Sequence, residues 1–124
     1  MEIYKGLDFD IWCKKKKISD QVLIDAVLEM NQGLYDALLG GSVYKKRIPL
    51  QGRGKRGGAR TILAFKKNNK AFYIYGFSKN QQENISPKEL AALKKLAKTY
   101  LNLSDDEIST SIKKGALIEV VNDG

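Results

Sequence analysis

The chain has 124 residues, 43% of them hydrophobic, and a formal net charge of +8. This length fits one domain of ordinary size, and the hydrophobic content favours a packed core over a disordered chain. The sequence contains no histidine and a single cysteine, which excludes an internal disulfide and His-dependent catalytic triads and disfavours a zinc site.

The first element is expected to be a short helix over residues 3–13. Its apolar side chains Ile3, Leu7 and Ile11 recur at helical spacing. The four lysines that follow, residues 14–17, break this pattern and are typical of a solvated helix end, where cations favour the negative end of the helix dipole.

A second helix is expected after Ser19, a good N-cap residue. An apolar stripe at helical spacing runs from Leu23 to Leu38, which is about five turns. Gly40 and Gly41 follow the stripe and end the predicted helix.

The middle of the chain changes to a strand pattern. The stretches "VYKKRIPL" (43–50), "RTILAF" (60–65) and "AFYIYGF" (71–77) are rich in β-branched and aromatic residues. The polar stretch "KKNNK" (66–70) favours a turn. The last two strands are therefore predicted to form a hairpin over residues 60–77.

The last third returns to helices. Ser86 with Glu89, and Ser104 with Glu107, each form a capping-box pattern that predicts a helix start. The stretch "ALIEVV" (116–121) fits a final strand or an extended tail.

The expected order is thus two helices, three strands and two helices. Consecutive strands with short turns predict a small twisted antiparallel sheet packed against N-terminal and C-terminal helices, an α+β fold. We expect one domain over residues 1–124, because the chain shows no internal repeat and no linker-like stretch. No apolar run approaches the roughly 18 residues of a membrane span, and the start lacks a signal-peptide layout, so a cytoplasmic protein without a membrane partner is expected.

The positive charge is concentrated in one segment. Residues 43–80 hold eleven Lys or Arg and no acid, whereas residues 1–42 and 81–124 each carry a slight negative balance. Such a segment attracts polyanions and speeds their capture. Solubility alone is the alternative explanation.

The stretch "QGRGKRGGAR" (51–60) contains the pattern GxGxxG of dinucleotide-binding loops. That motif needs a strand before it, a helix after it and an acidic residue further on, whereas here a strand follows and no acid appears. A disordered RGG-type tract is usually terminal and repetitive. We therefore interpret this stretch as a loop that holds a polyanion, through Arg53, Lys55 and Arg56.

Arg60 stands where this loop becomes a buried strand. A guanidinium fixed there by packing suits electrostatic stabilisation of a phosphoryl transition state, and a structural salt bridge is the alternative. Hairpin geometry brings Lys79 close to Arg60. Strand alternation places Lys45 and Arg47 on one face and the lysine between them on the other.

Aromatic side chains on the third predicted strand are candidates for contact with bases. Alternation places Tyr73 and Tyr75 on the same face, where they either belong to the core or stack a base.

The segment "GGSVYKKRIPLQGRGKRGGARTILAFKKNNKAFYIYGFSKN", together with "LSDDEIS" and "GALIEV", resembles the HigB-type branch of the RelE/ParE superfamily, the toxins of type II toxin-antitoxin systems. The resemblance extends from about residue 18 to residue 120. It implies the same small α+β fold and an endoribonuclease that cuts mRNA, usually in the ribosomal A site. The ribose 2′-hydroxyl attacks the adjacent phosphate in this chemistry, without a metal or cofactor.

The resemblance also implies roles for individual residues. Arg60 corresponds to the arginine that stabilises the phosphate charge, and Lys79 to a basic residue that protonates the leaving oxygen. Lys46 is the candidate base, which requires a lowered pKa. The residues expected to grip RNA are Lys45, Arg47, Arg53, Lys55, Arg56, Tyr73, Tyr75 and Phe77. The aromatic residues enter this set because the last 20 residues lack the C-terminal tyrosine of several relatives.

The partners implied are a helix-turn-helix antitoxin (HigA-like), the ribosome and its mRNA. Two other functions stay open at this point. One is a ParE-like inhibitor of DNA gyrase, which uses the same fold, and the other is an RNA-binding module without catalysis.

Overall fold

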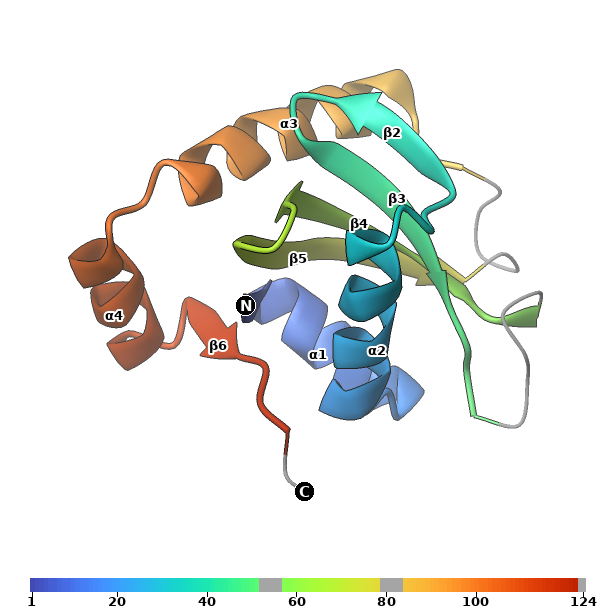
Figure 1. The fold of residues 1–124 in the computed structure, drawn as a ribbon, viewed down its shortest axis with the longest axis horizontal. Helices are drawn as coiled ribbons and strands as arrows, with labels where there is room; N and C mark the ends of the chain where they lie inside the picture. The colour runs from blue at the N-terminus through green and yellow to red at the C-terminus, as the bar shows by residue number, and fades with distance from the viewer. Residues whose placement is uncertain (52–56, 79–83, 123–124) are drawn as a thin grey trace.

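The computed structural model describes residues 1–51, 57–78 and 84–122. In this part of the chain, six strands form a sheet and four helices pack against it (Figure 1). The strand order is β2-β3-β4-β5-β1-β6, and neighbours are antiparallel except for the parallel pair of β1 and β5. In chain order the elements are β1 (Glu2–Gly6), α1 (Leu7–Lys16), α2 (Asp20–Asn31), β2 (Ala37–Gly40), β3 (Val43–Ile48), β4 (Ala59–Lys66), β5 (Lys70–Ser78), α3 (Pro87–Leu101), α4 (Asp105–Lys113) and β6 (Leu117–Glu119).

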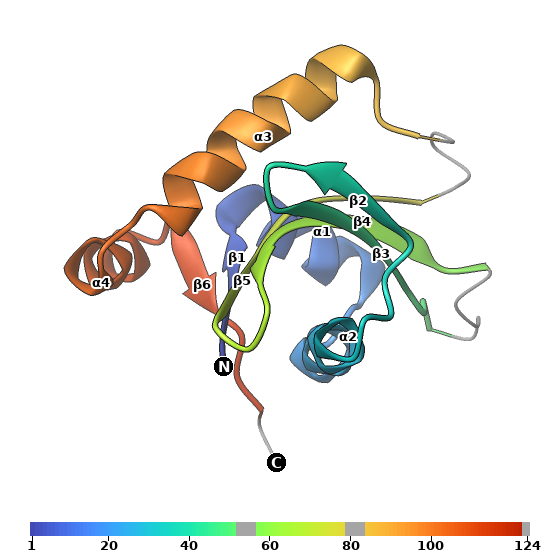
Figure 2. The ribbon, with the colours of Figure 1, turned by 45° about the horizontal axis from the view of Figure 1, so that its top comes forward.

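The helices divide between the two faces of the sheet (Figure 2). On one face, α1 and α2 supply Phe9 and Val27 to a buried cluster that includes Tyr73 of β5. On the other face, α3 and α4 supply Ala97 and Ile108 to a second buried cluster. The predicted α+β class is therefore confirmed, with N-terminal helices covering one face and C-terminal helices the other.

The predicted helix over residues 3–13 is wrong for its first turn. This turn is the strand β1, in which Ile3 and Tyr4 are buried, and α1 follows it at once. The ring of Tyr4 stacks on Phe72, with the ring centroids 5.2 Å apart. Because β1 pairs with β5 on one side and with β6 on the other, its partners come from distant segments, and the spacing of three apolar residues could not reveal them.

The second helix starts as predicted but ends earlier. The hydroxyl of Ser19 caps α2 by accepting a hydrogen bond from a backbone N–H of the first turn. The helix stops at Asn31, because Gly33 adopts a φ of +87° and turns the chain away. Leu34 and Leu38, which the apolar stripe had assigned to this helix, are 55% and 56% exposed. The chain returns as β2 instead of continuing the helix.

Local signals elsewhere in the chain are confirmed. The hairpin predicted over residues 60–77 is formed by β4 and β5. Both capping boxes are present, Ser86 with Glu89 at the start of α3 and Ser104 with Glu107 at the start of α4. The final apolar stretch contains the short strand β6, which pairs with β1.

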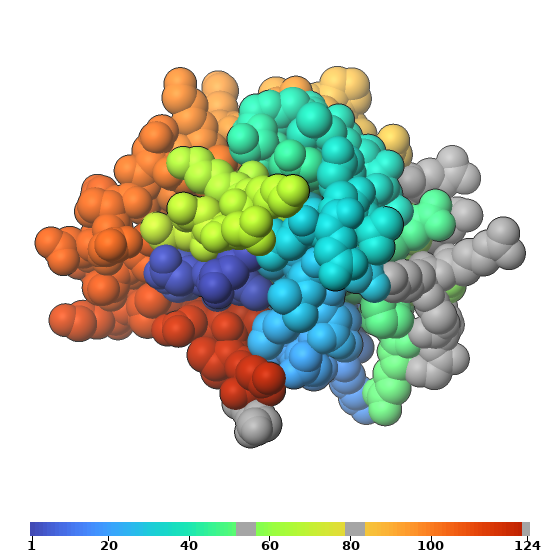
Figure 3. Space-filling model, viewed as in Figure 1, coloured from blue at the N-terminus to red at the C-terminus, as the bar shows by residue number. Residues whose placement is uncertain are grey.

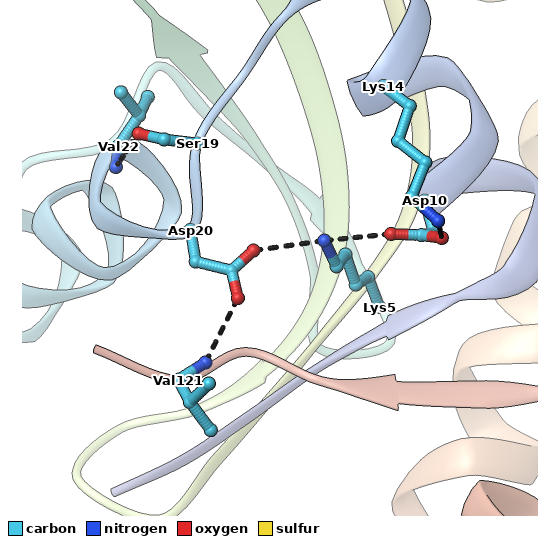
Figure 4. Close-up of polar contacts among 7 residues, drawn as sticks. All are labelled: Lys5, Asp10, Lys14, Ser19, Asp20, Val22 and Val121. Carbon is cyan, nitrogen blue, oxygen red and sulfur yellow. Dashed lines mark hydrogen bonds and ion pairs between the residues drawn. The ribbon is translucent and has the colours of Figure 1, made fainter. Parts of the chain in front are cut away.

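A buried lysine joins both ends of the chain to α1 and α2 (Figure 4). Lys5 Nζ lies 2.9 Å from Asp10 Oδ1 and 3.0 Å from Asp20 Oδ1. The backbone N–H of Val121 donates to the other oxygen of Asp20. Burial alone would lower the pKa of Lys5, but its bonds to the two carboxylates outweigh burial and leave the pKa raised. Burial likewise opposes the charged form of Asp10, yet bonds from Lys5 and Lys14 leave its pKa lowered.

Replacing Asp10 with asparagine is expected to cost about 1–3 kcal/mol of stability at neutral pH and much less in acid. A carboxyl with a lowered folded-state pKa stabilises the fold above its ordinary pKa of about 3.9, and this contribution disappears as the pH falls through the lowered value. Urea unfolding of the wild type and Asp10→Asn at pH 7, 4 and 3 measures the difference. A difference that stays constant across this range would contradict a role for the Asp10 charge.

Gly76 of β5 leaves room for the indole of Trp12. A Cβ added at Gly76 would lie 2.4 Å from Cζ3 of that ring. We therefore expect Gly76→Ala to lower the unfolding free energy by about 1–3 kcal/mol, because the indole must shift in a packed site. The same substitution in a Trp12→Leu background should cost clearly less. A double-mutant cycle by urea unfolding tests this, and strictly additive effects would show that the two residues do not constrain each other.

Candidate functional site

The register of three strands brings side chains of the basic segment together. Arg47 of β3 lies opposite Arg60 of β4, and Arg60 lies opposite Phe77 of β5. Two residues further along β4, Ile62 lies opposite Lys45 of β3 on one side and opposite Tyr75 of β5 on the other. Residues directly opposite each other in antiparallel strands project from the same face of a sheet. The register therefore places two arginines, a lysine and a tyrosine on one face, and we call these four residues, Lys45, Arg47, Arg60 and Tyr75, the arginine face.

The arginine face is the side of the sheet that α3 covers. Ile62 and Ala64, two and four residues beyond Arg60, belong to the buried cluster under α3. Because side chains alternate along a strand, Arg60 projects to the same side. Phe77 is 1% exposed and belongs to the same cluster, so it forms part of the floor beside Arg60.

Arg60 itself is half-buried, and its Nη1 is fully buried. Within the part of the chain that the structure describes, this nitrogen has no hydrogen-bond partner. A buried cationic donor without a partner is costly, and an arriving anion removes that cost. The planar guanidinium matches the geometry of a phosphate, so the position of Arg60 suits the capture of a phosphodiester.

Arg47 is held at the end of β3 by Asp36. Its Nε lies 3.6 Å from Asp36 Oδ1, and its backbone N–H donates to the other carboxylate oxygen. The side chain of Arg47 is 45% exposed, so it stays accessible to an anion in solution. Asp36 is a residue that the sequence analysis missed. It precedes a strand that was predicted as helix, and no motif marks it.

Lys46 lies on the opposite side of the sheet from the arginine face. Its Nζ is 2.6 Å from Glu29 Oε1 of α2, and the residue is 5% exposed. The structure thus corrects the expectation that Lys46 is the base of the reaction, because strand alternation directs it to the helix layer formed by α1 and α2. Lys45, on the arginine face, is the half-buried lysine of this strand that points the other way.

The three aromatic candidates of β5 divide into two kinds. Tyr73 is fully buried, and its hydroxyl donates to the carbonyl of Leu23 at 2.8 Å. Tyr73 and Phe77 are therefore core residues, and neither presents its ring to a base. The pairing of β4 with β5 shifts between Ile62 and Leu63, so that Ile74 is an extra residue in β5. As a result, Tyr75 packs with the cluster under α3, while Tyr73 packs with the cluster under α1 and α2. The expectation that both tyrosines share a face is wrong for this reason.

Tyr75 is half-buried at the edge of the arginine face. Its pKa is raised, first by burial and then by the carboxylate of Glu89, with which its hydroxyl forms a hydrogen bond. Glu89 also accepts a hydrogen bond from the backbone N–H of Ser86 in the capping box of α3. The sequence identified Glu89 only as a helix cap. Its place beside Tyr75 follows from the packing of α3 on β5.

The glycine-rich loop between β3 and β4 is described only at its base. Arg53, Lys55 and Arg56, and also Lys79 after β5, lie outside the described residues. At the base, a Cβ added to Gly58 would lie 2.0 Å from the carbonyl oxygen of the last residue of β3. The absence of a side chain at Gly58 therefore allows close contact between the end of β3 and the start of β4.

The described residues provide neither a metal-binding cluster nor a membrane-spanning helix. No three of their His, Cys, Asp and Glu side chains gather closely enough to hold a metal ion. None of the helices described is both long and apolar enough to cross a membrane.

A comparison with protein families identifies a match. The family model described as "RelE toxin of RelE / RelB toxin-antitoxin system" matches residues 1–120. The matched range extends from before β1 to the residue after β6, so it includes β3, β4 and β5, which carry the arginine face.

Stability measurements distinguish a binding role of Arg60 from a structural one. Because Nη1 of Arg60 has no partner among the described residues, Arg60→Ala is expected to change the unfolding free energy by less than about 1 kcal/mol. Lys46→Met, which keeps most of the stem but removes the ion pair between Lys46 and Glu29, is expected to cost about 1–2 kcal/mol, since the carboxylate is only partly exposed. Urea unfolding measures both. A larger cost for Arg60→Ala than for Lys46→Met would show that Arg60 is mainly a structural residue.

Proposed function

The chain belongs to the RelE toxin family of toxin-antitoxin systems, and we propose that it is an endoribonuclease that cuts mRNA on the ribosome and thereby inhibits translation. The observation that carries this proposal is the arginine face. It combines a buried guanidinium nitrogen without a partner among the described residues, at Arg60, with a second arginine directly opposite it. Such a pair suits a phosphodiester whose negative charge grows during the reaction.

The chemistry proposed is transfer within the RNA strand. The ribose 2′-oxygen passes its proton to solvent water and forms a bond to the adjacent phosphorus, while the bond from phosphorus to the 5′-oxygen of the next nucleotide breaks. The leaving 5′-oxygen takes up a proton, so the products are a 2′,3′-cyclic phosphate and a 5′-hydroxyl. Arg60 and Arg47 would stabilise the charge on the phosphate oxygens, and Lys79 is the proposed donor of the proton to the leaving oxygen.

Other residues of the arginine face are proposed to hold the RNA. Lys45 is placed to contact the backbone next to the reacting phosphate, together with Arg53, Lys55 and Arg56 of the loop. Tyr75 is the aromatic residue of β5 that keeps partial exposure on this face, so it takes the base-contacting role that Tyr73 and Phe77 cannot fill. Its hydrogen bond to Glu89 would fix the position of the ring.

The proposed partners follow from the same assignment. A RelE-family toxin pairs with an antitoxin, and the finer proposal is a helix-turn-helix antitoxin of the HigA-like kind, as expected for a HigB-type toxin. Covering the arginine face would be sufficient for inhibition, because it removes the phosphate site. The ribosome and its mRNA are the proposed targets, which places the activity in the cytoplasm.

Cleavage during translation is the direct test. In a cell-free translation reaction, the wild type is expected to produce new mRNA 5′ ends at fixed codon positions. Arg60→Ala is expected to lower the rate by about 10²-fold or more, because it removes a donor aimed at the reacting phosphate. Arg60→Lys should recover only part of the rate, since an ammonium lacks the bidentate geometry. Lys113→Ala, a change of the same charge on the exposed end of α4, is the control and should cleave like the wild type.

The same reaction separates the rival functions. Intact mRNA together with a change in DNA supercoiling by gyrase would contradict the proposal and favour a gyrase inhibitor. Intact mRNA with retained affinity for RNA would favour a binding module without catalysis.

A further inference from the structure

A basic pocket lies away from the arginine face, between α3 and two turns of the sheet. Figure 3 shows the β2–β3 turn, the β4–β5 turn and α3 coming together on one side of the molecule. The cavity between them measures about 590 Å³. Its polar lining is formed by Lys66, Lys94, Lys95, Lys98, Ser42 and Asn102, and we call it the lysine pocket.

The four lysines of the pocket carry no compensating charge. Among the described residues, none that lines the cavity is acidic, and none forms an ion pair with any of the four lysines. Converging like charges repel one another, so this arrangement costs stability in the free protein. A polyanion in the cavity would offset this repulsion, because its negative charges attract all four lysines.

The position of a helix end does not account for this cluster. A cation in the last turn of a helix is favoured by the helix dipole, which explains Lys98 alone. Lys94 and Lys98 are four residues apart, a spacing at which like charges destabilise a helix. Lys66 comes from the end of β4, and Lys94 reaches across to the β2–β3 turn, where its Nζ is 3.2 Å from the position of a Cβ on Gly40. Two separate elements, β4 and α3, therefore direct lysines into one cavity, and the β2–β3 turn completes its wall.

The lysine pocket and the arginine face are separate sites. Arg60 is near the start of β4 and Lys66 is its last residue, so the two lie at opposite ends of the same strand (Figure 1). Six residues of extended strand span roughly 20 Å. In a nucleic-acid helix, that length corresponds to about six nucleotides of one strand. One phosphate group cannot reach both sites.

We propose that the lysine pocket is a second phosphate-backbone site, which docks a structured RNA segment of the ribosome while the arginine face acts on the mRNA. This inference rests on the proposed function, since it names a partner of the same reaction. The described residues that line the pocket include no aromatic side chain that would stack a base, and lysines bind phosphates as flexible point charges. Recognition there is therefore of the backbone and independent of sequence.

Binding to ribosomes at several salt concentrations tests the lysine pocket. All proteins carry Arg60→Ala, so that mRNA stays intact during the measurement. The pocket variant Lys94→Gln/Lys95→Gln/Lys98→Gln is compared with Lys88→Gln/Lys113→Gln/Lys114→Gln, which removes the same charge from exposed lysines outside the pocket. We expect the pocket variant to bind purified ribosomes at least 10-fold more weakly. The slope of log K against log salt should also fall by about 2–3, since each lost phosphate contact contributes about 0.9.

The control triple variant is expected to keep most of the affinity and slope of the Arg60→Ala protein. Equal loss in both triple variants would overturn the inference, because it would assign the effect to total charge. Absence of ribosome binding by the Arg60→Ala protein would overturn it as well. So would a pocket variant that binds ribosomes normally but binds the antitoxin weakly, since this would identify an acidic protein segment as the ligand.

Two further measurements keep the result unambiguous. Thermal unfolding should show the pocket variant at least as stable as its parent, because like charges have been removed. The cleavage assay with intact Arg60 separates the two proposals. If ribosomes bind through the pocket but mRNA stays intact, the lysine pocket is supported and the endoribonuclease activity is contradicted. If mRNA is cleaved but the pocket variant binds ribosomes as tightly as its parent, the endoribonuclease activity is supported and the lysine pocket is contradicted.

Discussion

The position of β1 depends on the ammonium of Lys5, which is buried between two carboxylates. Asp10 comes from α1 and Asp20 from α2, and Asp20 also accepts the backbone N–H of Val121 after β6. Lys5 thus ties β1 to α1 and α2, and Asp20 ties the segment after β6 to the same cluster. A buried ion pair of this kind contributes less to net stability than to the choice of one arrangement, since a displaced β1 would leave an unpaired charge in the core. Because β1 pairs with β5, this arrangement also positions the strand that carries Tyr75 of the arginine face.

Tyr75 belongs to the arginine face because of an irregularity in β5. A regular strand would direct Tyr73 and Tyr75 to the same side. The extra residue at Ile74 separates them, so that Tyr73 closes the core against α2 while Tyr75 joins the arginine face. Bulges often redirect side chains next to functional sites. Here the bulge follows the Ile62–Tyr75 pair, two residues along β4 from Arg60, and the α3 capping residue Glu89 holds the redirected hydroxyl.

The sequence predicted the features that depend on neighbouring residues. Capping boxes at Ser86 and Ser104 and the hairpin of β4 and β5 are local patterns, and the structure contains all three. The strand β1 depends on partners far along the chain, so the helical spacing of its apolar residues was misleading. The strand β2 pairs with its neighbour β3, and the apolar stripe of α2 continued into it only by coincidence of spacing, because Gly33 had already ended the helical path. The candidate site shows the same division. Alternation separated Lys46 from Lys45 and Arg47 in advance, but the side on which Glu29 lies, and hence the loss of Lys46 as a base, required the packing of α2.

The structure also changes the meaning of the basic segment. As a sequence, residues 43–80 form one uniform positive region of eleven cations. In the fold, Lys46 and Arg47 are committed to Glu29 and Asp36, so part of this charge is used to attach the sheet to α2 and to the start of β2. Arg60 and Lys66 keep no ion-pair partner among the described residues, and they stand at opposite ends of β4. Unpaired cations are those that gain most from an incoming phosphate, because their own protein neutralises them least. It is therefore the ion pairing within the fold, more than the total charge, that leaves Arg60 and Lys66, at opposite ends of β4, available to the two proposed binding sites.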